Sequence, residues 1–185
     1  MVPLNGPNLL TLARIGLVPV MVALLWGEET GTLSAAAAVF ALAALTDAAD
    51  GHLARSRNCC TSFGRLADPL ADKLLVGAAL AALVALDRLA VWIAVVVVAR
   101  EIGVAALRWH AQGNGIVMHV TQLAKVKTGV QMVAIVALML TPDPAAGWVA
   151  ALLVAVVAIT IASGAQYVLA YARRPAPAAA VGVSG

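Results

Sequence analysis

Four aspartates in two pairs have types and spacing suited to chemistry: Asp47 with Asp50, and Asp68 with Asp72. Spacings of three and four residues place both members of each pair on one face of a helix. If the two helices run antiparallel on either side of the polar stretch 56–62, all four carboxylates can converge. Carboxylate oxygens are hard ligands, so this cluster predicts a site for one or two Mg²⁺ or Mn²⁺ ions.

Small and basic residues accompany these aspartates. Gly51 directly follows the second aspartate, and Gly64 lies four residues before the third. A glycine inside a helix costs about 1 kcal/mol relative to alanine, so its use here indicates the close approach of a ligand or of backbone. Arg55, one turn after Gly51, offers a planar fork for phosphate. Together these residue types predict a site for a metal-bound polyphosphate.

A second polar cluster follows later in the chain. Arg100 and Arg108 are eight residues apart and therefore share one face of a helix, two turns apart. Glu101 is the nearest acid to Arg100, and we expect the two to pair because a buried charge needs a partner. Lys125 and Lys127 open the next apolar segment. The two arginines and two lysines could bind a phosphate dianion, to which arginine can donate two hydrogen bonds at once.

The segments that carry these residues are strongly apolar. Of the 185 residues, 63% are hydrophobic, more than a soluble domain of this length can bury. We therefore predict an all-α, polytopic membrane protein in one domain, residues 1–174, with a disordered tail over 175–185. Six transmembrane helices, each near the roughly 20 residues that a bilayer requires, are expected at 8–26, 32–56, 64–86, 89–110, 124–141 and 146–171.

The distribution of charge predicts the orientation. With six spans and a cytoplasmic N-terminus, the outer loops carry mainly acids: Glu28, Glu29, Asp87 and Asp143, with Arg88 as their one basic residue. The inner side carries Arg55, Arg57, Lys125, Lys127, Arg173 and Arg174. This asymmetry obeys the positive-inside rule. It places both termini, a polar cleft with the aspartates, and the loop thiols of Cys59 and Cys60 on the cytoplasmic side.

The larger aromatic residues fall near the expected ends of the spans. Trp26, Trp92 and Trp148 lie near outer ends, whereas Trp109, Tyr167 and Tyr171 lie near inner ones. Tryptophan and tyrosine are enriched at membrane–water interfaces because their rings are amphipathic. We therefore expect all six side chains to belong to interfacial belts.

The aspartate motif resembles the signature of the CDP-alcohol phosphatidyltransferases, D-x2-D-G-x2-A-R-x8-G-x3-D-x3-D. The matching residues are Asp47, Asp50, Gly51, Ala54, Arg55, Gly64, Asp68 and Asp72. The resemblance implies transfer of a phosphatidyl group from CDP-diacylglycerol to an alcohol, with CMP as the other product. It implies metal ligation by the four aspartates, with Asp72 also the catalytic base, and a homodimer. The residues expected to bind CDP-diacylglycerol are Gly51, Ala54, Arg55, Thr61, Gly64 and Arg65.

The second polar cluster resembles one branch of this family, the phosphatidylglycerophosphate synthases. The motifs are A-R-E-x5-L-R followed by K-x-K-T-x2-Q-M, matched by Ala99, Arg100, Glu101, Leu107, Arg108, Lys125, Lys127, Thr128, Gln131 and Met132. This branch usually has glycine where Ala124 stands. The resemblance implies glycerol 3-phosphate as the acceptor, bound by Arg100, Arg108, Lys125 and Lys127. Basic residues alone would also suit inositol phosphate or phosphatidylglycerol.

A different class of protein remains as an alternative. Acids within a membrane also mark ion pathways, so an ion-coupled transporter would place charged residues in apolar segments too. Against that interpretation, the acids cluster near one face, and the sequence has no internal repeat or pair of broken helices. The expected partners are therefore CDP-diacylglycerol, glycerol 3-phosphate, the product CMP, membrane lipids and a second copy of the chain, and no nucleic acid.

Overall fold

The computed structural model describes residues 6–27, 29–57, 62–114, 116, 118 and 121–173, with side chains except at 6–11, 47–70 and 72. In this part every element is an α-helix, which confirms the all-α prediction. The helices are α1 (Gly6–Leu25), α2 (Thr30–Arg57), α3 (Ser62–Ala85), α4 (Val91–Gly113), α5 (Gln122–Leu140) and α6 (Gly147–Ala172). Each helix coincides with one predicted apolar segment. The proposed tail, 175–185, lies outside the described residues.

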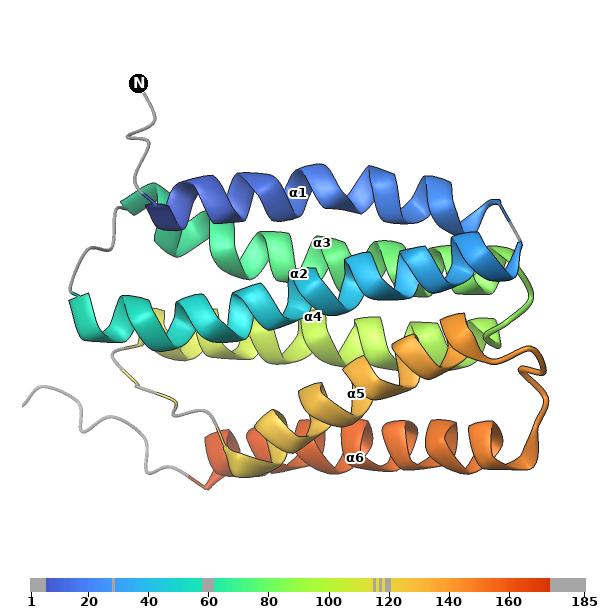
Figure 1. The fold of residues 1–185 in the computed structure, drawn as a ribbon. Helices are drawn as coiled ribbons and strands as arrows, with labels where there is room; N and C mark the ends of the chain where they lie inside the picture. Colours follow the sequence, from blue (N-terminus) through green and yellow to red (C-terminus); the bar gives the residue numbers. More distant parts are fainter. Residues whose placement is uncertain are drawn as a thin grey trace, which may run out of the picture.

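Successive helices alternate in direction (Figure 1). Helix α1 packs against α2 and α3, and α6 packs against α4 and α5, while α2 and α5 join the two groups. Large apolar side chains fill the interior, among them Met21, Phe40, Leu75, Leu83 and Ile135. Because the directions alternate, the end of α2, the start of α3, the end of α4 and the start of α5 all lie at one end of the bundle.

The turn after α3 is a Schellman motif. Arg88 N donates to Leu83 O at 2.9 Å, and Asp87 N donates to Val84 O at 3.1 Å. Asp87 has a φ of 54°, a left-handed conformation that aspartate tolerates better than most residues. This turn directs the Arg88 side chain to the last carbonyls of α5, where it donates to Leu138 O (Nε, 3.2 Å) and to Thr141 O.

Helix α5 begins with a side-chain cap. Thr121 is extended (φ −76°, ψ 155°), and its Oγ1 accepts a hydrogen bond from Ala124 N at 3.2 Å. This satisfies one of the backbone N–H groups that the first turn of a helix leaves without an intrahelical partner. The cap fixes where α5 starts, and so which of its residues face the preceding helix.

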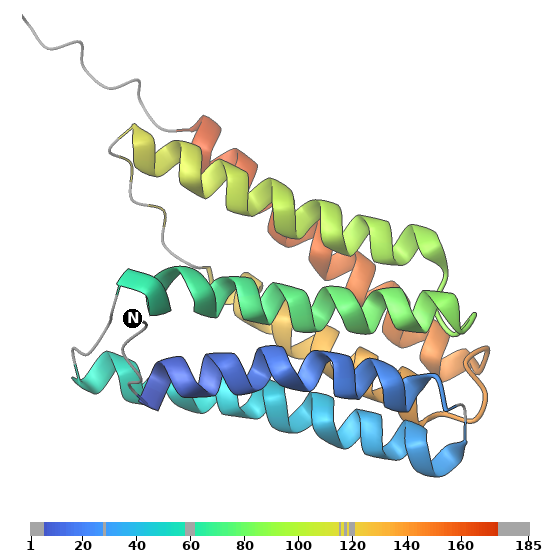
Figure 2. The same ribbon diagram turned by 90° about the horizontal axis from the view of Figure 1, so that it is seen from above.

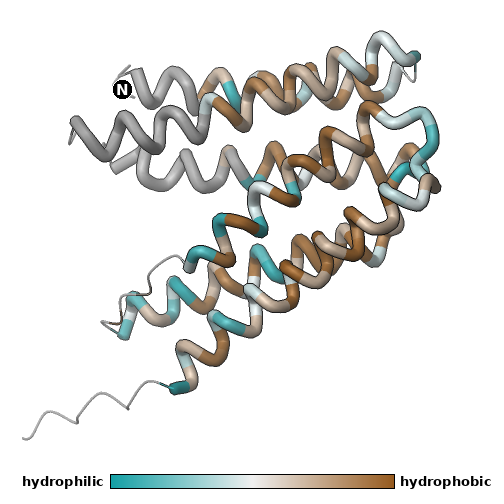
Figure 3. Tube along the Cα trace, turned by 60° about the horizontal axis from the view of Figure 1, so that its bottom comes forward, coloured by the Kyte–Doolittle hydropathy of each residue, from teal (hydrophilic) through white to brown (hydrophobic). Residues whose placement is uncertain are grey.

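The surface of the described bundle is rich in apolar side chains. Exposed examples on the last three helices include Ile102, Val133, Val154 and Ile161, and Figure 3 shows hydrophilic residues mainly near helix ends and loops. Within the described residues, α5 and α6 are long and apolar enough to cross a membrane. Such a surface suits a lipid environment better than water.

The prediction for the aromatic belts is wrong at Tyr167. The tryptophans at 26, 92, 109 and 148 are exposed, as belt residues should be, whereas Tyr167 is only 2% exposed. The reason is the packing of α6 against α4, which encloses this face of α6 within the protein. Tyr167 therefore belongs to the interior of the molecule and to its polar network.

Candidate functional site

A pocket of about 420 Å³ lies between α3, α4, α5 and α6 at the end of the bundle where α2 finishes and α3 begins. We call it the basic pocket. Its lining consists of Lys73 from α3, then Arg100, Glu101, Val104, Ala105 and Arg108, then Ala124, Lys125 and Thr128, and Tyr167. Four cationic side chains face one carboxylate, so the pocket favours an anion. Its volume falls in the range of small-molecule sites.

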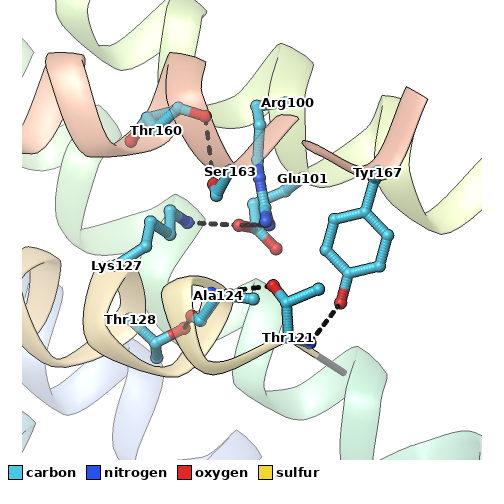
Figure 4. A network of polar contacts seen from close by, with 9 residues as sticks. All are labelled: Arg100, Glu101, Thr121, Ala124, Lys127, Thr128, Thr160, Ser163 and Tyr167. Atoms are coloured by element: carbon cyan, nitrogen blue, oxygen red, sulfur yellow. Dashed lines mark hydrogen bonds and ion pairs between the residues drawn. The ribbon is translucent and has the colours of Figure 1, made fainter. Parts of the chain in front are cut away.

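One carboxylate oxygen holds two cations at the edge of this pocket (Figure 4). Arg100 Nη1 donates to Glu101 Oε1 at 3.0 Å, and Lys127 Nζ donates to the same oxygen. The Lys127 side chain is 2% exposed and that of Arg100 is 12% exposed. Buried cations are strongly destabilising without a counter-charge, so Glu101 allows both to stay charged inside the protein. The predicted pairing of Arg100 with Glu101 is confirmed.

Helix α6 completes the network, although its sequence has no charged residue. The Arg100 Cζ atom lies 5.7 Å from the centroid of the Tyr167 ring, within the range of a cation–π contact. The Tyr167 hydroxyl accepts a long hydrogen bond, 3.4 Å, from Thr121 N at the start of α5. One side chain of α6 therefore contacts both neighbouring helices that supply the pocket's basic residues.

A second pocket, of about 220 Å³, adjoins the first between α3, α4 and α5. It shares Lys73, Glu101 and Thr128 with the basic pocket, and its other lining residues are mainly apolar, such as Leu80 and Ile102. We call it the apolar pocket. The helices around it diverge, since α3 has few contacts with α4 and α5, as Figure 2 illustrates for α3 and α4.

The structure brings three of the four predicted acceptor-binding residues together. Arg100, Arg108 and Lys125 line the basic pocket. Lys127 instead lines the apolar pocket and donates to Glu101, because the start of α5 turns it inward, away from Lys125. Its positive charge is therefore paired with Glu101 at the edge of the basic pocket, and Lys127 is not part of that pocket's lining.

Lys73 and Tyr167 line the basic pocket although neither is among the residues predicted to bind the acceptor. For Lys73 the available signal is its position in the sequence, directly after Asp72. Tyr167 gave no such signal, because a tyrosine near the end of an apolar segment is typical of an interfacial belt. Only the contact between α4 and α6 places it beneath an arginine.

The predicted metal ligands occupy the last turns of α2, which carry Asp47 and Asp50, and the first turns of α3, which carry Asp68 and Asp72. Their side chains lie outside the described ones, as do those of Ala54, Arg55 and Arg65. Gly51 and Gly64 lie on the same helical segments, and Thr61 is outside the described residues altogether. Among the described side chains, no group of three or more His, Cys, Asp and Glu residues is placed to hold a metal ion. Metal ligation by the aspartates therefore remains a prediction.

The backbone arrangement is compatible with that prediction. Helices α2 and α3 are antiparallel, and the segments that carry the two aspartate pairs lie at the same end of the bundle (Figure 1). The donor set at these positions is all carboxylate, which fits a hard divalent cation. Lys73, which lines the basic pocket, directly follows Asp72 in α3. The aspartate motif and the basic pocket therefore adjoin along the chain of α3.

Comparison with known proteins points to one family. A family model described as CDP-alcohol phosphatidyltransferase matches residues 4–174. A Bacillus subtilis (strain 168) protein, CDP-diacylglycerol–glycerol-3-phosphate 3-phosphatidyltransferase, is 43% identical over 148 residues, which are 74% of this chain and 77% of that protein. A probable phosphatidylglycerophosphate synthase of Mycobacterium tuberculosis (strain H37Rv) is 39% identical over 169 residues, 89% of this chain and 80% of that protein.

Proposed function

This chain belongs to the CDP-alcohol phosphatidyltransferase family, and we propose that it transfers the phosphatidyl group of CDP-diacylglycerol to glycerol 3-phosphate, with CMP as the second product. The observation that carries the proposal is the position of Lys73. This residue directly follows the last aspartate of the family motif and lines the same pocket as Arg100, Arg108 and Lys125. The donor site and an anion site are therefore adjacent.

The acceptor follows from the charge of the pocket and from the relatives. Glycerol 3-phosphate carries a phosphate dianion, which four cations facing one carboxylate would attract. The arginines can each donate two parallel hydrogen bonds to phosphate oxygens. The similar B. subtilis protein is named for glycerol 3-phosphate, which favours it over inositol phosphate and phosphatidylglycerol. Membership of a transferase family leaves the ion-coupled transporter without support.

In the proposed reaction, a hydroxyl oxygen of glycerol 3-phosphate forms a bond to the phosphorus that carries the diacylglycerol. The bond from that phosphorus to the CMP oxygen breaks, and CMP leaves with the electron pair. Asp72 accepts the proton of the attacking hydroxyl, while the basic pocket holds the acceptor's phosphate and so positions the hydroxyl. Asp47, Asp50, Asp68 and Asp72 would hold one or two divalent cations, which supply neutralisation of the pyrophosphate charge.

The proposed setting is the cytoplasmic membrane of a bacterium, with six spans and with both termini and the polar cleft on the cytoplasmic side. The apolar surface, the alternating helix directions and the charge asymmetry of the loops support this orientation. The apolar pocket beside the basic pocket supports lateral entry of the lipid donor, whose acyl chains would stay in the bilayer. Each CH₂ withdrawn from hydrocarbon would cost about 0.8 kcal/mol.

The test is CMP release by purified protein in detergent micelles that contain CDP-diacylglycerol. We expect release to require Mg²⁺ or Mn²⁺ and glycerol 3-phosphate, and the lipid product to have the mass of phosphatidylglycerophosphate. Parallel reactions contain inositol phosphate, phosphatidylglycerol or no acceptor. Release that depends on one of these other acceptors, and not on glycerol 3-phosphate, would contradict the proposed acceptor, and no release with any acceptor would contradict the transferase activity.

A further inference from the structure

The Arg100 side chain is confined on several sides. Glu101 Oε1 binds Nη1 at 3.0 Å, and the Tyr167 ring centroid lies 5.7 Å from Cζ. The aliphatic stem passes close to α6, where a Cβ built on Gly164 would lie 3.3 Å from Arg100 Cγ. That distance is shorter than most contacts of real Cβ atoms. A side chain at position 164 would therefore push the aliphatic stem of Arg100 out of its present position.

In this orientation, two hydrogen-bond donors of the guanidinium have no acceptor in the described part of the protein. Arg100 Nε and Nη2 are buried and have no hydrogen-bond partner among the described residues. These two N–H groups form one edge of the planar guanidinium, the kind of edge that binds two oxygens of a phosphate or carboxylate. A buried charged donor without a partner is unfavourable, so an anion bound at this edge would satisfy both groups.

Tyr167 also makes a hydrogen bond at the start of α5. Its hydroxyl accepts from Thr121 N, at the residue that caps α5, and Lys125 of α5 lines the basic pocket. Tyr167 itself is 2% exposed, and Gly164 lies three residues before it on the same face of α6. Tyr167 thus contacts the Arg100 side chain of α4 and the backbone of the residue that caps α5, four positions before Lys125.

We propose that Gly164 and Tyr167 are positioning residues for the acceptor: they orient Arg100, and Tyr167 also holds the start of α5, so that the basic pocket can bind the acceptor's phosphate. This rests on the proposed function, since glycerol 3-phosphate is the ligand in question. Neither residue has a charge or takes part in the transfer. Most of their effect is exerted through Arg100, which distinguishes the proposal from ordinary packing of α6 in the core.

The experiment compares Gly164→Ala, Tyr167→Phe and Tyr167→Leu with the wild-type chain. Gly164→Ala displaces the arginine stem, Tyr167→Leu removes the ring, and Tyr167→Phe removes only the hydroxyl. We expect Gly164→Ala and Tyr167→Leu to raise the KM for glycerol 3-phosphate about three- to tenfold. Tyr167→Phe should lie between Tyr167→Leu and wild type, because it keeps the ring. The KM for CDP-diacylglycerol should stay within about twofold in all three.

Two further arms separate positioning from a purely structural role. Gly147→Ala and Tyr171→Phe are matched controls on α6, because Gly147 has open space around its Cα and Tyr171 does not line the basic pocket. The second arm is a double-mutant cycle, in which Tyr167→Leu is introduced beside Arg100→Ala. Because Tyr167 acts through the guanidinium, most of its effect on the KM for glycerol 3-phosphate should vanish in that background.

The outcomes are distinguishable. An unchanged KM for glycerol 3-phosphate in Gly164→Ala and Tyr167→Leu overturns the inference, as does an undiminished effect of Tyr167→Leu beside Arg100→Ala, or an equal rise in both KM values. If Tyr167→Leu does not fold, as judged by thermal unfolding in detergent, Gly164→Ala and Tyr167→Phe carry the same test. Failure of the proposed function itself would appear separately, as the absence of glycerol-3-phosphate-dependent CMP release by the wild-type protein.

Discussion

At the scale of residues, Glu101 has an unusual position for an acid, since it lies at the edge of a pocket that attracts anions. Its Oε1 atom accepts from Arg100 and from Lys127, so it neutralises part of the charge that would otherwise be buried. Arg108, Lys125 and Lys73 line the same pocket, and Arg100 keeps one guanidinium edge without an acceptor among the described residues. The pocket region therefore contains cations that pair with a carboxylate of the protein and cations that can bind an anionic ligand.

The first prediction concerns the aspartate motif. Asp68→Asn keeps the size of the side chain but removes the negative charge that a divalent cation needs, so the rate of CMP release should fall about a hundredfold or more. The thermal unfolding temperature should stay close to that of the wild type. The matched control is Asp87→Asn in the turn after α3, which should retain activity. Near-normal turnover of Asp68→Asn at ordinary Mg²⁺ concentrations would count decisively against metal ligation by the motif.

The second prediction divides the two substrates between two arginines. Arg108→Ala should raise the KM for glycerol 3-phosphate about tenfold or more, because hydrogen bonds from a charged donor contribute about 1.5–3 kcal/mol. Arg55→Ala should instead raise the KM for CDP-diacylglycerol, since the family motif assigns Arg55 to the donor. Steady-state kinetics with each substrate varied in turn provides the measurement. A rise in the same KM for both variants would show that this division is wrong.

At the scale of elements, the bundle is held differently at its two ends. At one end, the Schellman turn after α3 directs Arg88 onto the final carbonyls of α5, which are otherwise without an intrahelical partner. At the other end, side chains of α4, α5 and α6 meet around the basic pocket. Stability and ligand binding are thus assigned to opposite ends of the same helices.

The third prediction follows from that division. Arg88→Ala removes hydrogen bonds to Leu138 O and Thr141 O and should lower the free energy of unfolding by about 2 kcal/mol. Both KM values should remain unchanged, because Arg88 follows the C-terminal end of α3 and does not line the basic pocket. Arg173→Ala is the control, since this exposed residue at the end of α6 should shift stability by less than about 0.5 kcal/mol. Equal melting temperatures for the two variants would refute the role of Arg88.

At the scale of the whole molecule, two groups of three helices are joined chiefly through α2 and α5. The aspartate motif belongs to the first group, on α2 and α3, whereas most of the basic pocket belongs to the second. Helix α3 connects them, because it carries Asp68 and Asp72 and then Lys73. The proposed transfer therefore takes place where the two groups meet, with the donor on one side and the acceptor on the other.

The fourth prediction concerns orientation in the membrane. Cys59 and Cys60, between α2 and α3, are the two cysteines of the chain, so a membrane-impermeant thiol reagent has no competing site. We expect labelling in inverted vesicles and none in intact cells. The control is a variant in which both cysteines are replaced by serine and Asp143, between α5 and α6, is replaced by cysteine; it should be labelled in intact cells. The reverse pattern would invert the proposed orientation.

Features that depend on local spacing could be predicted from the sequence alone. Helical periodicity and the length of apolar runs are properties of neighbouring residues, so the six helices were predicted with ends within about three residues of those observed. The same local rule put Arg100 and Arg108 on one face and paired Arg100 with Glu101. The aspartate motif could be recognised in the same way, because all its members lie within residues 47–72 of the chain.

The identity of the helices that share a pocket could not be predicted from the sequence and is seen in the folded molecule. No spacing along the chain indicates that α6 packs on α4, so the sequence predicts an interfacial position for Tyr167. In the structure, the centroid of its ring instead lies 5.7 Å from Arg100 Cζ. Likewise, Lys125 and Lys127 look equivalent in the sequence, yet the start of α5 directs one to the basic pocket and the other to Glu101. Contacts between distant segments depend on how whole helices pack, and that packing is set by the sum of many side chains rather than by any one motif.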